Sequence, residues 1–357
     1  MPNKKKYNVI DLFCGCGGLS LGFKMANFNI IGGVDFEKDC IDTFSLHFKN
    51  SKNFYGDISK ISDNEIRKTY QDIDVIIGGP PCQGFSAANM WEKDVKKDKR
   101  NDLFREFLRF VKILKPKALV LENVSRILTQ DKGEIKKEII RSLEELGYLV
   151  SYKILTASNY SVPQKRRRNF FVAISKKNTK FDMDSIKDEE PTILDDALSD
   201  LYDMESGLLY DSITTISKSN YQTLMRKNSK NKIYNHDPKY PIKRVVDRIK
   251  HVKEGENWKS VPEHLWETIR YNRHSSAYRR LDSKGFSITI DCGHMNYFHP
   301  KFDRVPTVRE SARIQSFPDD FIFLGAQGSQ YRQVGNAVPP LMAKSIAKAL
   351  KRALNNG

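Results

Sequence analysis

The segment VIIGGPPCQGFS, from Val75 to Ser86, contains a cysteine in a setting that favours chemistry over packing. The apolar residues before it predict a buried strand, so Cys82 would follow a strand end, where open α/β sheets bind their ligands. The preceding prolines stiffen the backbone, whereas a structural cysteine normally lies within an apolar element. We therefore interpret Cys82 as a reactive thiol that faces a ligand.

A glycine turn, CGCGG, joins a predicted strand, YNVIDLF, to a predicted helix, LSLGFKMA. Gly15 and Gly17 fit the dinucleotide-binding pattern G-x-G-x-x-G, but its third position is Ser20. Asp35 follows the next predicted strand, where a carboxylate can bind both ribose hydroxyls, and Asp57 follows a third short strand, where it can bind an adenine amino group. These residues predict an adenosine-containing ligand. The alternative is that glycine and aspartate only cap the elements.

Predicted strands and helices alternate along the first half of the chain. Strand-like segments such as FNIIGGVD, DVIIGG and KALVLENV are accompanied by amphipathic segments such as LFREFLRFVKIL and EIKKEIIRSLEELG. This alternation predicts a doubly wound, mostly parallel α/β sheet. From about residue 176 to residue 303 the sequence is polar, irregular and too long for one loop, so a second domain is expected there.

The charge and composition limit the partners and the compartment. A net charge of +16 favours a polyanionic partner, although a solvated basic surface would give the same number. No apolar run approaches the roughly 18 residues of a membrane span, and the N-terminus lacks the apolar core of a signal peptide. Five cysteines, an odd number, suit a reducing compartment, so a cytoplasmic location without membrane contact is expected. The spacing of Cys292, His294 and His299 matches no tetrahedral metal site, so no metal is predicted.

Six motifs occur in an order that identifies a family. They are FCGCGG, PPCQGFS, ENV from Glu122, QKRRR from Gln164, RVPTVRESARIQSFP and QVGNAVPP. With them, nearly the whole chain resembles the DNA cytosine-5 methyltransferases, above all those of bacterial restriction-modification systems. The resemblance implies an S-adenosylmethionine-dependent methyltransferase fold with an inserted target-recognition domain. It places the catalytic and cofactor-binding domain at 1–185 plus 330–357, and the recognition domain and hinge at 186–329.

The resemblance also implies a role for each motif residue. Cys82 would add to carbon 6 of cytosine, the Glu122 carboxyl would face N3, and Arg166 and Arg168, on alternate positions of one strand, would bind the cytosine carbonyl and organise the site. The residues implied to bind S-adenosylmethionine are Phe13, Gly15, Gly17, Gly18, Asp35, Phe36, Asp57, Pro81 and Asn336.

Double-stranded DNA is the implied substrate, and the target base must leave the helix to be methylated. The residues predicted to contact DNA are Gln83, Ser86, Arg100, Thr223, Leu224, Arg226 and Arg273. The protein is expected to act as a monomer. Three alternatives stay open: a relative that acts on tRNA, a non-catalytic DNA-binding protein on the same scaffold, and a nicotinamide oxidoreductase. The long insert disfavours the first, intact Cys82, Glu122 and Arg168 disfavour the second, and Ser20 with the thiol motif disfavours the third.

Overall fold

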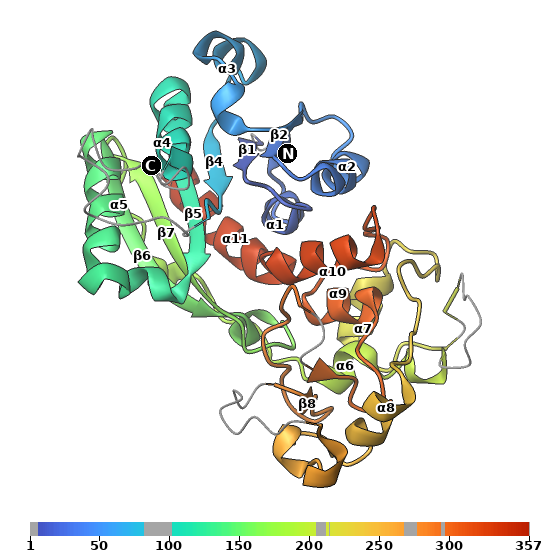
Figure 1. Cartoon of the computed structure of the whole chain (residues 1–357). Coiled ribbons are helices and arrows are strands. Elements are labelled where there is room, and N and C mark those ends of the chain that lie inside the picture. The colour runs from blue at the N-terminus through green and yellow to red at the C-terminus, as the bar shows by residue number, and fades with distance from the viewer. Residues whose placement is uncertain are drawn as a thin grey trace. The chain divides into compact units, whose positions relative to one another are not determined.

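The structure, a computed structural model, describes residues 6–81, 102–204, 212–213, 215–267, 277–293 and 297–356 (Figure 1). The chain forms two compact units. Unit 1 comprises Met1–Thr156, Arg167–Asp188 and Pro340–Gly357, and unit 2 comprises Ala157–Arg166 and Glu189–Pro339. The predicted division into 1–185 plus 330–357 and 186–329 assigned functions as well as boundaries, and it stays a prediction.

A seven-stranded sheet forms the centre of the described part of unit 1, in the order β3-β2-β1-β4-β5-β7-β6. Its strands are β1 Asn8–Leu12, β2 Asn29–Asp35, β3 Phe54–Tyr55, β4 Val75–Gly78, β5 Ala118–Val124, β6 Tyr148–Thr156 and β7 Arg167–Ser175. The pairs from β3 to β5 are parallel, whereas β7 pairs antiparallel with both β5 and β6. The carboxyl ends of β1, β2, β4 and β5 therefore meet at one edge of the sheet, where a ligand is expected.

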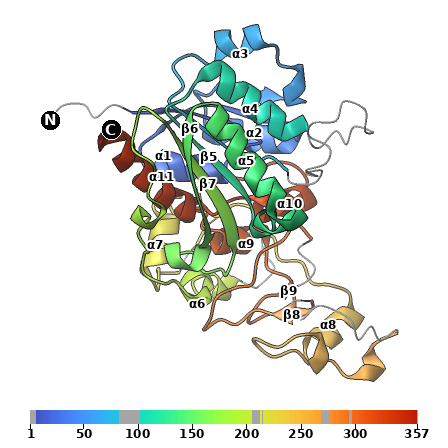
Figure 2. The same cartoon turned by 90° about the vertical axis from the view of Figure 1, so that its left-hand side faces the viewer.

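Helices cover both faces of this sheet. They are α1 Gly18–Met25, α2 Lys38–His47, α3 Asp63–Thr69, α4 Asp102–Leu114, α5 Glu134–Glu145 and α11 Pro340–Asn356. Short 3₁₀ helices span Ile58–Lys60, Ser125–Leu128, Gln130–Gly133 and Met183–Ser185. Alternate residues of β1 point to opposite faces: Ile10 and Leu12 share a hydrophobic cluster with residues of α4 and α5, while the Asp11 carboxyl accepts a hydrogen bond from Ser20 of α1. Figure 2 shows α4 and α5 on the same side of the sheet.

Helix α4 shows why these segments fold as they do. Phe104, Phe107, Phe110 and Val111 recur at helical spacing and are all buried, so one stripe of the helix packs against the sheet. On the other side of β1, α1 and α11 approach so closely that a Cβ on Gly22 would lie 2.3 Å from Cβ of Ala343. Apolar packing on both faces thus stabilises the large sheet, so the residues at its strand ends are available to bind a ligand.

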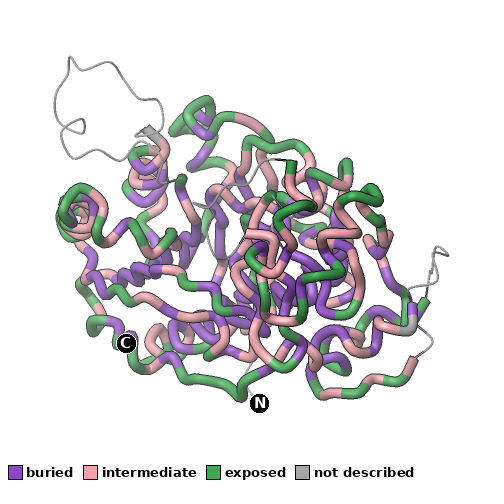
Figure 3. Tube along the Cα trace, turned by 60° about the horizontal axis from the view of Figure 1, so that its bottom comes forward, coloured by how far each residue is buried: buried purple, intermediate pink, exposed green. Residues whose placement is uncertain are grey.

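Unit 2 consists mainly of short helices and loops. Its helices are α6 Leu194–Leu198, α7 Asn220–Arg226, α8 Lys243–Ile249, α9 Val308–Ile314 and α10 Gln327–Asn336. Strands β8 Arg279–Arg280 and β9 Tyr297–Phe298 pair in parallel, and 3₁₀ turns span Ala157–Tyr160, Tyr202–Met204, Trp258–Ser260 and Glu263–Leu265. Every residue of α9 is buried, whereas α7 and α8 expose part of their surface. Figure 3 shows how buried, intermediate and exposed residues alternate along the chain.

The described ranges contain neither a helix suited to a membrane nor a cluster of metal ligands. None of their helices has the length and apolar character that crossing a lipid bilayer requires. In the same ranges, no group of three or more His, Cys, Asp or Glu side chains is arranged to hold a metal ion.

Candidate active site

The turn between β1 and α1 opens backbone N–H groups toward the sheet edge. Phe13 has a left-handed φ of 62°, and Gly17, the N-cap of α1, has φ 96°. A Cβ on Gly17 would lie 2.6 Å from the Phe48 ring, so both the conformation and the packing require glycine there. Gly18 begins α1, and the helix N-terminus favours a ligand with negative or acceptor groups.

Asp35 holds this turn in place from the end of β2. Its Oδ2 accepts a hydrogen bond from the Gly15 N–H at 2.8 Å, and its Oδ1 accepts one from the Glu37 N–H at 2.9 Å. Burial raises the pKa of Asp35 above its ordinary value, although the two N–H donors oppose this shift. The carboxylate thus orders the glycine turn and stands at the strand end where ribose binding is expected.

Aromatic side chains next to Asp35 are exposed. Phe36 is 64% exposed at the end of β2, and Tyr55 is 53% exposed at the end of β3. Asp57, also exposed, accepts hydrogen bonds from the Ser59 N–H and hydroxyl and caps a 3₁₀ turn. Exposed rings beside two carboxylates fit the adenosine of S-adenosylmethionine, because a flat base can stack on an aromatic face. Tyr55 was missed from the sequence, although its place at the end of the same short strand that precedes Asp57 could have indicated it.

Ser20 has a structural reason to replace the third glycine of the dinucleotide pattern. Its hydroxyl donates a 2.6 Å hydrogen bond to Asp11 Oδ2, and both residues are buried. Burial raises the pKa of Asp11 to about 7, although the Ser20 hydrogen bond opposes the shift. The departure from the pattern therefore satisfies a buried carboxyl beneath the turn.

Glu122 and Arg168 meet across strands β5 and β7. The strands pair Glu122 with Phe170 and Val124 with Arg168, so the two charged side chains lie on one face. Arg168 Nε lies 3.0 Å from Glu122 Oε1, and the side chains are only 16% and 14% exposed. Gly79, at the end of β4, packs beside this pair: a Cβ there would lie 2.9 Å from Glu122 Oε2. A carboxyl group is thus fixed next to the chain that leads into Cys82.

Arg166 is not on the strand, because β7 begins at Arg167. Its guanidinium is buried within unit 2, where Nη1 donates to the Ile290 carbonyl at 3.0 Å and Nη2 to the Gly335 carbonyl at 2.8 Å. The shared strand face expected for Arg166 and Arg168 is therefore not what the structure has. A catalytic role for Arg166 stays a prediction.

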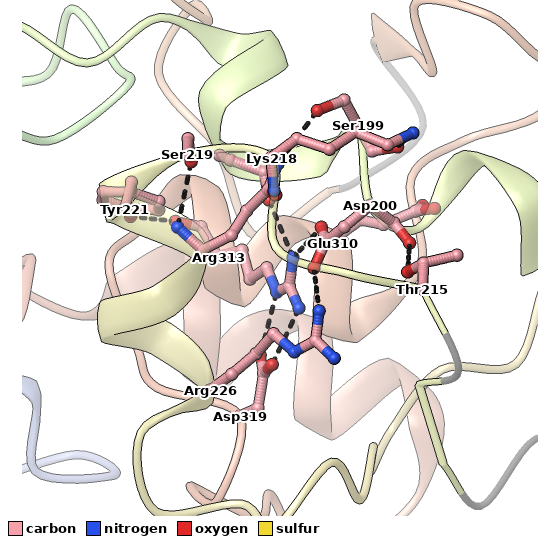
Figure 4. A network of polar contacts seen from close by, with 12 residues as sticks. Ser199, Asp200, Thr215, Lys218, Ser219, Tyr221, Arg226, Glu310, Arg313 and Asp319 are labelled. Atoms are coloured by element: carbon pink, nitrogen blue, oxygen red, sulfur yellow. Dashed lines mark hydrogen bonds and ion pairs between the residues drawn. The ribbon is translucent and has the colours of Figure 1, made fainter.

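The predicted DNA-contacting residues of α7 fall on two sides of the helix. Thr223 and Leu224 are exposed. Arg226 turns inward to Asp200 Oδ2 at 3.4 Å and Asn231 Oδ1 at 3.1 Å, and its side chain is 9% exposed. Figure 4 shows Arg226 in a polar network around Arg313, in which both arginines contact Asp200. Arg226 therefore stabilises the packed side of α7.

The other predicted residues are placed as follows. Asn336 ends α10 and is exposed, and its Oδ1 accepts a 2.7 Å hydrogen bond from the Cys292 thiol; Pro81 is also exposed. The predicted residues that lie outside the described ones are Cys82, Gln83, Ser86, Arg100 and Arg273.

Comparisons with known proteins agree with one another. The sequence model of the C-5 cytosine-specific DNA methylase family matches residues 7–352. Type II methyltransferase M.DdeI of Desulfomicrobium norvegicum is 36% identical over 98% of this chain and 89% of its own length, and type II methyltransferase M1.HphI of Haemophilus parahaemolyticus is 36% identical over 97% and 87%. A crystal structure from E. coli, described as a DNA modification methyltransferase encoded within a prophage, superposes with a TM-score of 0.79 at 30% identity, over 98% of this chain and all of that one.

These matches confirm the predicted fold class, reaction and cofactor. The sheet order, the glycine turn and the exposed rings fit S-adenosylmethionine, and DNA is the substrate of the matched family. The protein therefore belongs to the C-5 cytosine-specific DNA methylase family, whose members transfer a methyl group from S-adenosylmethionine to carbon 5 of cytosine.

Proposed function

We propose that the chain methylates one cytosine within a short duplex sequence as the protective half of a restriction-modification system, with Cys82, Glu122 and Arg168 carrying the chemistry. The observation that carries this proposal is the Arg168–Glu122 pair beside Gly79, three residues before Cys82. The type II names of the relatives support the protective role.

Each of these residues has a defined task in the proposed reaction. The Cys82 thiolate adds to carbon 6 and pushes electrons onto the ring, so that carbon 5 becomes nucleophilic. The Glu122 carboxyl stabilises the charge that develops at N3, and Arg168 orients that carboxyl through its 3.0 Å contact. Bound S-adenosylmethionine supplies the methyl group. Loss of the carbon 5 proton then expels Cys82 and restores the ring.

Unit 2 is proposed to read the target sequence. Its exposed Thr223 and Leu224 lie on α7, and Arg226 of the same helix pairs with the buried Asp200. A helix fixed on its inner side in this way suits contacts to base edges. The cytosine is proposed to flip out of the duplex before reaction. A monomer in the bacterial cytoplasm is the proposed working form.

Two substitutions test the chemistry. Cys82→Ser should abolish methyl transfer and leave the dissociation constant of S-adenosylmethionine nearly unchanged, because an alcohol is a poor nucleophile. Glu122→Gln should lower kcat by about 10²–10⁴-fold, since it removes the acid that serves N3.

DNA that carries 5-fluorocytosine at the target should trap a covalent adduct on Cys82. Substantial turnover by the serine variant, or an adduct mapped to Cys14, Cys16, Cys40 or Cys292, would contradict the assignment.

The cellular role needs a separate measurement. Bisulfite sequencing of DNA from cells that express the protein should show one short methylated motif. Methylation spread over unrelated sequences would contradict the restriction-modification role without affecting the chemistry.

A further inference from the structure

The parallel pairing of β4 and β5 stops just before the catalytic segment. The register runs from Val75 opposite Ala118 to Gly78 opposite Leu121. Beyond it come Pro80 and Pro81, which have no backbone N–H and cannot continue a hydrogen-bond ladder. Something other than backbone pairing must hold this part of the chain against β5.

Asn123 of β5 makes that connection with its side chain. Its Nδ2 donates a 2.9 Å hydrogen bond to the carbonyl of Pro80, and the residue is only 5% exposed. Its Oδ1 accepts a 2.9 Å hydrogen bond from the Val124 N–H, which fixes the carboxamide so that the NH₂ end faces Pro80. The amide thus ties the Pro80 carbonyl to β5 at the point where the backbone ladder has ended.

The neighbouring residue on β5 contacts the neighbouring residue of the same segment. Glu122 Oε2 lies where it would be 2.9 Å from a Cβ on Gly79, so the carboxylate sits directly against the glycine. Two consecutive residues of β5 therefore contact two consecutive residues of the catalytic segment. The distance between the Glu122 carboxyl and the chain at Pro80 is set by these contacts.

We propose that Asn123 is a positioning residue, which holds the Pro80–Pro81 backbone at a fixed distance from Glu122 so that the nucleophile and the carboxyl act on one base. This inference rests on the proposed roles of Cys82 and Glu122. A misplacement of about 1 Å between reacting groups costs on the order of 100-fold in rate, so loss of this single hydrogen bond should affect the chemical step.

Asn169 offers a matched control. It lies directly opposite Asn123 in the β5–β7 pairing and on the same face of the sheet, and it is fully buried. Among the residues that the structure describes, neither Nδ2 nor Oδ1 of its carboxamide has a hydrogen-bond partner. Replacing it by an apolar side chain of similar volume should therefore be neutral or stabilising.

The experiment compares Asn123→Leu with Asn169→Leu in the full-length protein. The readouts are the single-turnover methylation rate at saturating DNA and cofactor, the release of tritium from carbon 5 of the target cytosine, and the dissociation constants of S-adenosylmethionine and DNA. Asn123→Leu should lower both rates by about 10–100-fold and leave both dissociation constants within about twofold. Asn169→Leu should stay within about twofold of the unsubstituted protein throughout. Asn123→Asp keeps the size but lacks the NH₂ donor when ionised, and it decides the question if circular dichroism shows that Asn123→Leu is unfolded.

The possible results separate the inference from the proposed function. Saturated rates that are unchanged in the Asn123 variants, or matched by Asn169→Leu, overturn the positioning role, as does a loss confined to the dissociation constants. Loss of turnover in Cys82→Ser and Glu122→Gln together with active Asn123 variants overturns the inference alone. Full turnover in Cys82→Ser and Glu122→Gln overturns the proposed function and the inference with it.

Discussion

The two units each contain an arginine that pairs with carboxylates, and the surroundings of the two arginines differ. In unit 1, Arg168 contacts Glu122, and both side chains keep some exposure. In unit 2, Arg313 contacts Asp200 and Asp319, and all three side chains are fully buried. A pair that keeps contact with solvent can exchange one partner for a substrate group, whereas a fully buried set must keep its partners. The first arrangement suits chemistry and the second suits architecture.

The position of Arg313 in the chain supports this distinction. The Arg313 guanidinium donates to the Ala197 carbonyl near the end of α6 and to Asp319 beyond α9. The backbone carbonyl of Arg313 accepts a hydrogen bond from the Tyr221 hydroxyl of α7. Burial raises the pKa of Asp319, but the charge and hydrogen bond of Arg313, together with the charges of Arg309 and Arg226, hold the pKa below its ordinary value. Three helices thus share one buried cation, so its loss would leave two carboxylates short of a partner.

The largest expected effect comes from replacing Arg313 by methionine and comparing the result with the same replacement at Arg168. Arg313→Met should lower the free energy of unfolding by about 3–5 kcal/mol, because it leaves buried carboxylates without their cation. Arg168→Met should lower that free energy by less, about 1–2 kcal/mol, because its pair is mostly buried but keeps some exposure and involves one carboxylate. It should also lower kcat by at least about 100-fold. Urea unfolding and single-turnover assays on both variants would check this, and equal stability losses would contradict the distinction.

A second buried set in unit 2 should make stability depend on pH. His299 Nε2 lies 3.5 Å from Glu310 Oε1, and Arg304 pairs with Glu310. Burial lowers the pKa of His299 to about 3; Glu310 opposes this shift, while the positive charge of Arg304 adds to it. An unfolded histidine binds a proton below about pH 6.5, so the unfolded state binds more protons between pH 6.5 and 3 and stability falls as the pH falls.

His299→Asn removes this titration while an amide oxygen can still accept from the Lys301 or Phe302 N–H. Between about pH 6.5 and 5.5, where Glu310 stays ionised in both states, the unfolding free energy of the variant should fall with falling pH less steeply than that of the unsubstituted protein, by up to about 1.4 kcal/mol per pH unit. The raised pKa of Asp11 acts in the opposite direction in this range but is common to both proteins. Unfolding curves at several pH values would test the difference, and parallel pH profiles would show that His299 is protonated in the folded state.

The sequence predicted what depends on nearby residues and motifs, and missed what depends on distant ones. Strand ends carrying Asp35 and Glu122 followed from apolar runs and chain direction, and the motifs indicated the chemistry. Arg166 sits one residue before its predicted strand because its guanidinium binds carbonyls 124 and 169 residues away in the chain. The partner of Arg226 is likewise Asp200, on the far side of the α6–α7 connection. No local spacing encodes such contacts, so the sequence cannot tell a basic residue that is held by partners within the fold from one that faces solvent; the DNA-contacting role of Arg226 stays a prediction.

Arg226 gives the smallest expected effect and the finest test of the comparison. Because Asp200 keeps Arg313 when Arg226 is lost, Arg226→Ala should cost only about 1–2 kcal/mol of unfolding free energy. Its guanidinium faces Asp200 and Asn231, so the dependence of DNA affinity on salt should keep the slope of the unsubstituted protein, whereas loss of a phosphate contact would lower that slope by about 1. Lys227→Ala is the matched control, because it removes the same charge from the exposed next residue and should change stability by no more than about 0.5 kcal/mol. A reduced salt slope in Arg226→Ala with unchanged stability would show that Arg226 contacts DNA and does not stabilise the fold. The buried network would then depend on Arg313 alone.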